Sequence, residues 1–583
     1  IEYILYGNAS TATNKSIAYS SLYAARLAID MLYVFMDKEK NLAALTNLVR
    51  QAAAQGAKLI VLPEMCATGY YFDSMEQAAE MAEPIANGQT VRLLENLAKE
   101  LDCYLVAGLP ELDGERLYNS AVLIGPEGLI GRHRKMHHYV PDSTWAKTGD
   151  EPVKVFNTPI GNIGIQICMD LSYPEGPRLS RLMGAQVLCS PMNWNEPSIP
   201  SSIWLTRAKE NGMYVIASNR HGNEKGFDFC GGSGIIDPEG RVVACQPHGD
   251  GIAIAEIDLE MKPDRSDIPL RRPKLYRELQ LQRYPWYQSQ YYQAYATEPL
   301  LEGKQFSTAV CSMKPENREE GFMAVKQAIS QAGKQGERLL VLPELVLGGV
   351  PDDLQQAQCV AIREDDPVWK ELSSLVMENH VDVILGFVLE ENGKLWNAAA
   401  CLCEDGSRHY YRKSHLTERE AQWAEAGDCA GLVLDRPYGR IGVLLGNEIF
   451  ITEVPRLLAN SGCDILAVPA VENPSCPPGI PEVQQEVEHY HLARVRANEN
   501  STYAVFAAQK GVSGIFGPDM FLVPRNEVVL NESGFADMTM DTRFILSDES
   551  GCPAINLVRE KPMLGTRHTT WYDKLIEETD CVL

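Results

Sequence analysis

Short runs of branched apolar residues alternate along the chain with segments of helical hydrophobic spacing. Residues 41–54 repeat apolar positions at helical intervals, whereas 58–62 is a short, largely apolar run of strand length. This alternation is typical of an α/β domain in which helices bury a sheet. A second helix is expected at 91–101, and further strands at 27–32, 104–109, 120–124, 163–168, 186–190, 214–218, 234–237 and 252–257.

The same order of short motifs occurs twice in the chain. Val-Leu-Pro-Glu at 61–64 recurs at 341–344, and Arg-Lys at 134–135 recurs at 412–413. The apolar run before residue 168 recurs from residue 441 onwards. Residues 184–191 recur as 462–469, and residues 207–211 recur as 496–500. The near-constant spacing between the copies predicts two domains of one fold. The last pair lies further apart, which predicts an insertion rich in Pro and Glu around 471–486.

These landmarks divide the chain into four parts. We expect an N-terminal arm (1–24), a first domain (25–275), a Tyr-rich linker (276–304) and a second domain (305–575). This segment contains more aromatic residues than a flexible linker would, so we expect it to pack as a strap between the domains.

Composition narrows the function classes. The chain has 583 residues, too many for one core, and a formal net charge of -25. This charge argues against nucleic-acid and anionic-membrane partners and favours small-molecule substrates. No apolar run reaches membrane-spanning length, and the 15 cysteines include no Cys-x-x-Cys pair, which favours reduced thiols in the cytoplasm. His137 and His138 have no companion ligands at metal-binding spacing, so no metal site is expected.

Three residues of different chemistry lie at or near the ends of predicted strands. Glu64 follows a strand and a proline, Lys135 closes an Arg/His-rich stretch, and Cys168 ends an apolar run. A carboxylate can take the thiol proton and return it to a leaving amine, and an ammonium can stabilise an oxyanion together with the backbone N–H of Met169. We also expect N–H groups at the start of the following helix to favour the thiolate. Each residue alone has a structural explanation, but together they predict acyl transfer through a thioester.

These motifs resemble those of a known family. Leu62-Pro63-Glu64, His133-Arg134-Lys135, and Gly164 to Asp170 followed by Tyr173-Pro174-Glu175 are similar to motifs of the carbon–nitrogen hydrolase family, the nitrilase superfamily. The resemblance covers about 25–275 fully and about 305–570 in a degenerate form. It implies αββα sandwiches, no metal or organic cofactor, and the roles of general base for Glu64, oxyanion stabiliser for Lys135 and nucleophile for Cys168. Because domains of the family usually pair across helices flanking the nucleophile, an internal pseudo-dimer is expected, and a higher homo-oligomer stays open.

A further carboxylate belongs to the resemblance. The family often carries a second glutamate shortly before a Gly-Asp pair that follows the lysine. Counted back from Gly149-Asp150, this position holds Asp142, which is one methylene shorter. Asp142 is therefore a candidate catalytic residue, with a plain loop residue as the alternative.

The second copy keeps the charged motifs but not the thiol. Glu344, Lys413 and Glu420 are present, whereas the position of Cys168 holds Gly446. Glycine offers no nucleophile, so we expect a pseudoenzyme domain that serves as a structural partner. A retained ligand-binding pocket is the alternative.

Residues around the nucleophile narrow the substrate class. Many nitrilases follow the cysteine with Trp-Glu, whereas Met169-Asp170 resembles the amidase-like and carbamoylase-like branches. Tyr70, Met169, Asn193 and Trp194 are candidates for substrate binding, with packing as the alternative. The sequence predicts hydrolysis of a non-peptide C–N bond in a small linear amide or carbamoyl amide. Nitrile hydrolysis by the same residues, and a non-catalytic binding or scaffold role, are the alternatives.

Overall fold

The computed structural model describes residues 23–195, 200–262, 266–282, 303–472, 492–518, 526–543, 545–546 and 555–578. Nearly all of the expected N-terminal arm, the Tyr/Gln-rich run of the linker and most of the expected insertion around 471–486 lie outside these residues.

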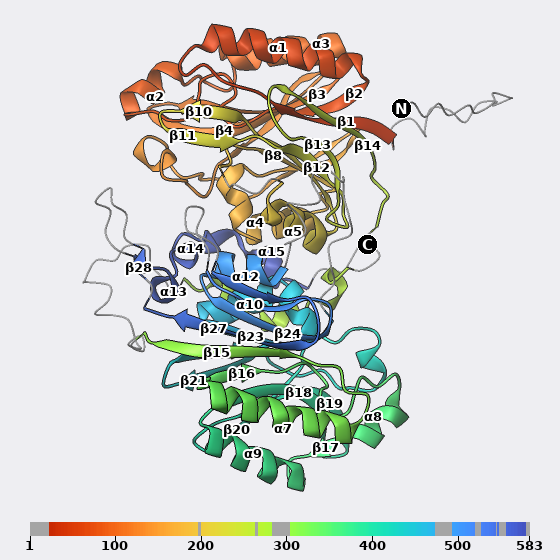
Figure 1. Cartoon of the computed structure of the whole chain (residues 1–583). Helices are drawn as coiled ribbons and strands as arrows, with labels where there is room; N and C mark the ends of the chain where they lie inside the picture. Colours follow the sequence, from red (N-terminus) through yellow and green to blue (C-terminus); the bar gives the residue numbers. More distant parts are fainter. Residues whose placement is uncertain are drawn as a thin grey trace, which may run out of the picture.

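The first domain consists of two sheets packed face to face between pairs of helices (Figure 1). One sheet has the order β14 (Gly251–Asp258), β1 (Tyr23–Asp30), β2 (Ala57–Val61), β3 (Tyr104–Asp113), β4 (Arg116–Gly125), β5 (Gly128–Arg134). The other has the order β13 (Val242–Gln246), β12 (Ser233–Ile236), β9 (Tyr214–Ser218), β8 (Val187–Pro191), β7 (Gly161–Ile165), β6 (Val155–Thr158). Helices α1 (Lys38–Ala54) and α3 (Gln89–Leu101) cover the first sheet, and α4 (Glu175–Leu182) and α5 (Ser202–Asn211) lie on the second.

Helix α1 shows how the sequence produces this layer. Its N-terminus is capped by the Asp37 side chain, which accepts a hydrogen bond from the Lys40 backbone N–H. Leu42, Leu45 and Val49 repeat at helical spacing and are buried against the sheet. The predicted helix at 41–54 is therefore confirmed.

The second domain repeats this architecture. One sheet has the order β27 (Gly534–Asp541), β15 (Gln305–Ser312), β16 (Leu339–Val341), β18 (Asp382–Glu391), β19 (Lys394–Leu402), β20 (Arg408–Arg412). The other has the order β26 (Glu527–Leu530), β25 (Ser513–Phe516), β24 (Tyr503–Lys510), β23 (Ile465–Glu472), β22 (Gly439–Val443), β21 (Leu432–Arg436). Helices α7 (Arg318–Gln335) and α9 (Pro367–Asn379) lie outside, and α10 (Glu453–Asn460) and α12 (Leu492–Asn500) lie inside. The strand orders match those of the first domain, so the predicted repeat of αββα sandwiches is confirmed.

The two domains pack through their inner helices. Figure 1 shows α4 and α5 facing α10 and α12, and one continuous apolar core includes residues of both helix pairs, such as Leu205 and Val454. The chain thus forms the internal pseudo-dimer that was predicted.

Each domain is also held by a segment that follows the sandwich of the other domain in sequence. Arg271, beyond the last sheet strand of the first domain, donates to Glu453 of the second over 2.7 Å. Arg567, beyond the last sheet strand of the second domain, forms an ion pair of 3.1 Å with Glu175 of the first. Glu175 and Glu453 are equivalent residues at the starts of α4 and α10. We call 266–282 and 555–578 the exchanged straps.

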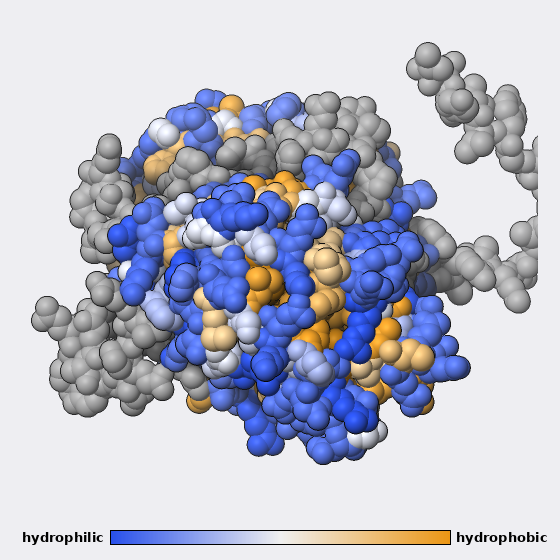
Figure 2. Space-filling model, turned by 60° about the horizontal axis from the view of Figure 1, so that its bottom comes forward, coloured by the Kyte–Doolittle hydropathy of each residue, from blue (hydrophilic) through white to orange (hydrophobic). Residues whose placement is uncertain are grey.

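The outer surface of the second domain is shown in Figure 2. It is predominantly hydrophilic, with apolar patches between the polar side chains. Exposed apolar side chains at this end include Met323 and Met377, on α7 and α9. None of the helices in the described part of the chain combines the length and apolar character that crossing a membrane requires.

Candidate active site

Two strand ends of the first sheet bring a carboxylate and an ammonium together. Glu64 lies just beyond β2, and Lys135 follows β5 directly. Lys135 Nζ lies 2.7 Å from Glu64 Oε1 and 2.7 Å from Asp142 Oδ2. All three side chains are buried. Asp142 is therefore part of the charged cluster and not a plain loop residue.

Cys168 lies where the chain leaves the second sheet. β7 ends at Ile165, before the predicted end of the strand, and Cys168 begins a short 3₁₀ helix, η2 (Cys168–Ser172). Its φ of +45° lies in the left-handed region, which is strained for a residue with a side chain and is often found at functional sites. The backbone N–H of Asn193 works to lower the pKa of the Cys168 thiol. The left-handed backbone thus sets the direction in which the Cys168 side chain leaves the corner.

Burial and neighbouring charges set the protonation states of the cluster. Burial raises the pKa of the Cys168 thiol well above its ordinary value, and Glu64 raises it further, against the opposing effect of Lys135. Burial and Glu64 thus outweigh the groups that favour the thiolate, and the direction of the pKa shift favours the neutral thiol. Burial also raises the pKa of Glu64, although Lys135 opposes this. Burial works to lower the pKa of Lys135, but Asp142 and Glu64 outweigh it and raise that pKa.

Asn119 connects the two carboxylates, and the sequence analysis missed it. Its Nδ2 donates to Glu64 Oε1 over 2.7 Å and to Asp142 Oδ1 over 2.8 Å. The second domain has Asn397 in the same place, donating to Glu344 and Glu420 over 2.8 and 2.7 Å. Alignment of the two internal copies would have shown this shared asparagine.

Asp170 holds the loop that carries Lys135. Its carboxylate accepts hydrogen bonds from the backbone N–H groups of Met136 and His137, over 3.1 and 2.9 Å. The rings of His133 and His137 each lie 2.9 Å from it. Burial works to raise the pKa of Asp170, but the bonds from the two histidines hold it well below its usual range. Asp170 belongs to the motif around Cys168, but this positioning role was not predicted from the sequence.

The four candidate substrate-binding residues fall in different surroundings. Tyr70 donates from its hydroxyl to Asp142 Oδ2 over 3.0 Å, and Asn193 Nδ2 donates to the backbone oxygen of Glu64 over 3.2 Å. Both therefore contact the cluster. Met169 is half-buried. Trp194 is buried in the core with its ring centroid 5.8 Å from that of Trp204, an arrangement that favours the packing alternative.

The second domain contains the same charged cluster without a thiol. Lys413 Nζ lies 2.8 Å from Glu344 Oε1 and 2.6 Å from Glu420 Oε1. Gly446 has a φ of +50°, close to the +45° of Cys168. The corner of the backbone is thus preserved while its side chain is absent. Within the described ranges, no group of three His, Cys, Asp or Glu side chains is arranged to hold a metal ion.

Comparison with known proteins identifies the family. The model of the carbon-nitrogen hydrolase family matches residues 24–262 and 307–536. The chain therefore belongs to the carbon-nitrogen hydrolase family and contains its domain twice.

Individual relatives resemble single domains in length. A nitrilase of Pyrococcus abyssi is 37% identical over 225 residues, covering 38% of this chain and 86% of that protein. Omega-amidase NIT2 of Danio rerio is 33% identical over 269 residues, covering 43% of this chain and 96% of that protein. Among solved structures, Saccharomyces cerevisiae Nit3, described as a member of branch 10 of the nitrilase superfamily, has 28% identity and a TM-score of 0.38, covering 41% of this chain and 90% of that chain.

Proposed function

We propose that the first domain hydrolyses a small linear amide to an acid and ammonia or an amine, with Cys168 as the nucleophile. The observation that carries this proposal is the cluster of buried Glu64 and Lys135, whose charges both act on the Cys168 thiol. The omega-amidase relative supports the amide class.

The first half-reaction forms a thioester. Glu64 accepts the proton of the Cys168 thiol as the sulfur attacks the amide carbon, which makes a tetrahedral oxyanion. The ammonium of Lys135 and the backbone N–H of Met169 stabilise this oxyanion. Glu64 then returns the proton to the amide nitrogen, the C–N bond breaks and ammonia or an amine leaves. The raised pKa of Glu64 suits both transfers, since a more basic carboxylate accepts the thiol proton more readily.

The second half-reaction returns the free enzyme. Glu64 takes a proton from a water molecule, whose oxygen attacks the thioester carbon. Collapse of the second tetrahedral intermediate breaks the C–S bond and releases the carboxylic acid, and the proton on Glu64 returns to the sulfur. Lys135 faces the same oxygen in both halves, which is consistent with its fixed position between two carboxylates.

Nitrile hydrolysis is the second candidate, because the Pyrococcus abyssi relative is named a nitrilase. The same thiol would add to a nitrile carbon and form a thioimidate, which water converts to the thioester with release of ammonia.

The cysteines of the apolar cores, such as Cys66, Cys103 and Cys311, are buried free thiols, as in proteins of a reducing compartment, and this supports a cytoplasmic location.

The experiment is a substrate panel with a matched pair of variants. The full chain is incubated with short amides, carbamoyl amides and nitriles, released ammonia is assayed, and intact mass is used to detect an acyl adduct. Cys168→Ala should abolish turnover and the adduct, whereas Cys245→Ala, a half-buried thiol on β13, should keep both. Unchanged turnover in a folded Cys168→Ala variant would refute the proposal. Turnover of nitriles without amides would favour the second candidate.

A further inference from the structure

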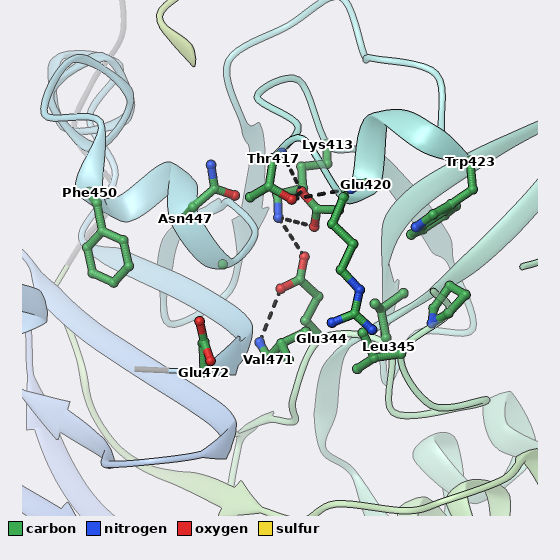
Figure 3. Close-up of a pocket in the computed structure, with 14 residues that line it drawn as sticks. Glu344, Leu345, Lys413, Thr417, Glu420, Trp423, Asn447, Phe450, Val471 and Glu472 are labelled. Carbon is green, nitrogen blue, oxygen red and sulfur yellow. Dashed lines mark hydrogen bonds and ion pairs between the residues drawn. The ribbon is translucent and has the colours of Figure 1, made fainter. Parts of the chain in front are cut away.

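A cavity of about 270 Å³ opens beside the charged cluster of the second domain. Figure 3 shows Lys413 and Glu344 facing each other at its centre, with Phe450 and Trp423 on opposite sides. Its volume lies near the lower end of the range for pockets that bind small molecules.

Several side chains that line this cavity are smaller than their counterparts in the first domain, although Phe450 stands where that domain has Ser172. The internal repeat matches Val350 with Tyr70, Thr417 with Tyr139, and Gly446 with Cys168. A domain kept only as a packing partner would be expected to fill such space, since interiors are close-packed and voids are destabilising. Here the space is retained and lined by buried charges.

Glu344 has taken the place of the missing thiol. A Cβ atom at Gly446 would lie 2.5 Å from Glu344 Oε2 and 3.2 Å from Lys413 Nζ. Glu344 Oε2 accepts a hydrogen bond of 3.2 Å from the backbone N–H of Val471. Val471 is the counterpart of Asn193, whose backbone N–H lowers the pKa of the Cys168 thiol in the first domain. The carboxylate therefore borders the position that a nucleophile would occupy.

The groups at this position define the chemistry of a ligand. Lys413 uses two of its three N–H donors on Glu344 and Glu420, and no third acceptor is found among the described residues. Glu344 Oε2 retains acceptor capacity beside this donor. A group with adjacent C=O and N–H, such as a carboxamide, complements both at once.

The other charges of the cavity exclude simple ions. Three carboxylates, of Glu344, Glu420 and Glu472, line it and repel an anion. Next to its ammonium, Lys413 repels a cation, and its ion pairs with Glu344 and Glu420 already occupy two of the three carboxylates. The rim Arg419 is paired with Asp352. Leu345, Trp423 and Phe450 provide apolar walls for a short hydrocarbon body.

We propose that the second domain is a non-hydrolytic binding site for a small neutral carboxamide, held between Lys413 and Glu344. The carbonyl oxygen accepts from Lys413 and the amide N–H donates to Glu344. No covalent step is proposed, because Gly446 stands in the place of Cys168 and no cysteine lines the cavity among the residues that the structure describes. This goes beyond the function proposed for the first domain.

Fluorine NMR titration of the full chain with trifluoroacetamide tests this proposal. Cys168→Ala serves as the background, so that the amide is not consumed in the first domain. Glu344→Gln should weaken one binding event about tenfold, as expected for a lost charge-assisted hydrogen bond. Glu337→Gln, a buried glutamate of the same domain outside the cavity, is the matched control and should change nothing.

Two further measurements, with a second cavity variant and with charged ligands, complete the test. Val350→Trp should fill the cavity without touching the ion cluster, so it should abolish the same binding event even if Glu344→Gln fails to fold. Trifluoroacetate and 4,4,4-trifluorobutylamine, an anion and a cation at neutral pH, should bind at least about tenfold more weakly than the amide, since each meets a like charge. Binding that survives both cavity variants overturns the proposal, as does equal binding of either ion. If the first domain binds no amide, the titration shows a single binding event, and the cavity variants still lose it. A failure of the function proposed for the first domain can therefore be distinguished from a failure of the binding site proposed for the second.

Discussion

The guanidinium of Arg207 donates to the carboxylate of Glu499 over 2.5 Å, across the boundary between the two domains. The equivalent pair runs in the opposite direction, with Arg496 donating to Glu210 over 2.5 Å. Each arginine also bonds the glutamate on its own helix. All four side chains are buried. Each charge has one partner on its own helix and gains a second one only when α5 and α12 are in contact, so the two domains share one buried network of charges.

We predict that Glu499→Gln destabilises the whole chain. It leaves two buried arginines with too few carboxylates, and breaking a buried ion pair on one side costs about 3–5 kcal/mol. The midpoint of urea unfolding should fall accordingly. Glu577→Gln is the control, because its ion pair with Lys574 is exposed and should contribute about 0–1 kcal/mol. Equal midpoints for the two variants would contradict the structural role of the buried charges.

A second prediction concerns the lost nucleophile. Gly446→Cys should destabilise the second domain, because the new Cβ meets Glu344 Oε2 at 2.5 Å. The expected cost is about 1–3 kcal/mol of overpacking in addition to about 1–2 kcal/mol for a side chain at positive φ. Gly393→Cys, at φ +75° with nothing within 4 Å of its Cβ, should show only the second cost.

The same substitution should not create a second active site. When combined with Cys168→Ala it should restore no amide turnover, since Glu344 occupies the space of the thiol and is not free to act as a base toward it. Measurable ammonia release from the double variant would show that the cluster can return to a catalytic arrangement.

The sequence predicted the parts of the site that lie on motifs. Glu64, Lys135 and Cys168 were expected together because each lies at or near the end of a predicted strand, whereas Asp142 was expected from the family resemblance. Asn119 lies within strand β4 and carries no local signal, so its role is visible only in the folded sheet or in its internal counterpart. The protonation state of Cys168 could not be read from the sequence, because burial of the sulfur outweighs the effect of the backbone N–H groups.

The exchanged straps show a second limit of prediction from the sequence. Arg271, Tyr276 and Leu279 have the same spacing as Arg567, Tyr572 and Leu575. This repeat was overlooked because it falls after each domain and at a different offset from the other motifs. That each segment lies on the opposite domain depends on the docking of the domains, which local sequence patterns do not contain.

The strap at 555–578, which lies on the first domain, leads to a prediction about pH. His568 Nε2 lies 2.7 Å from the backbone oxygen of Met136, next to Lys135, and must donate to it. Burial, and then His137, lower the pKa of His568 to about 4. A released strap would titrate near the ordinary value of about 6.5, so it binds the proton more readily than the docked strap. Docking is therefore fully stable above about pH 6.5 and weakens as the pH falls towards about 4.

The measurement is kcat/KM against pH for the wild type and His568→Gln. Glutamine keeps an N–H donor but does not titrate, so this variant should retain more of its activity between about pH 4 and 6.5. His568→Ala, which lacks the donor, should have lower activity over the whole range. Identical acid limbs for wild type and His568→Gln would exclude an effect of the strap on the Lys135 loop.

The last prediction concerns Asp142, which shares the ammonium of Lys135 with Glu64. Burial works to raise the pKa of Asp142, but Lys135 outweighs it, so the group is ionised at neutral pH. Its charge raises the pKa of both Glu64 and Lys135. Asp142→Asn should therefore move both limbs of the kcat/KM profile to lower pH. Loss of one of the two carboxylates that position the ammonium should also lower kcat, on the order of a hundredfold.

Asp142→Glu is the matched variant, because Glu420 occupies this position in the second domain and its Oε1 lies 2.6 Å from Lys413 Nζ. It keeps the charge, so its pH limbs should stay near those of the wild type, and its loss of kcat should be smaller than that of Asp142→Asn. A merely structural Asp142 would lower activity in both variants without moving either limb. That outcome would leave Lys135 and Glu64 as a pair whose protonation does not depend on the third carboxylate.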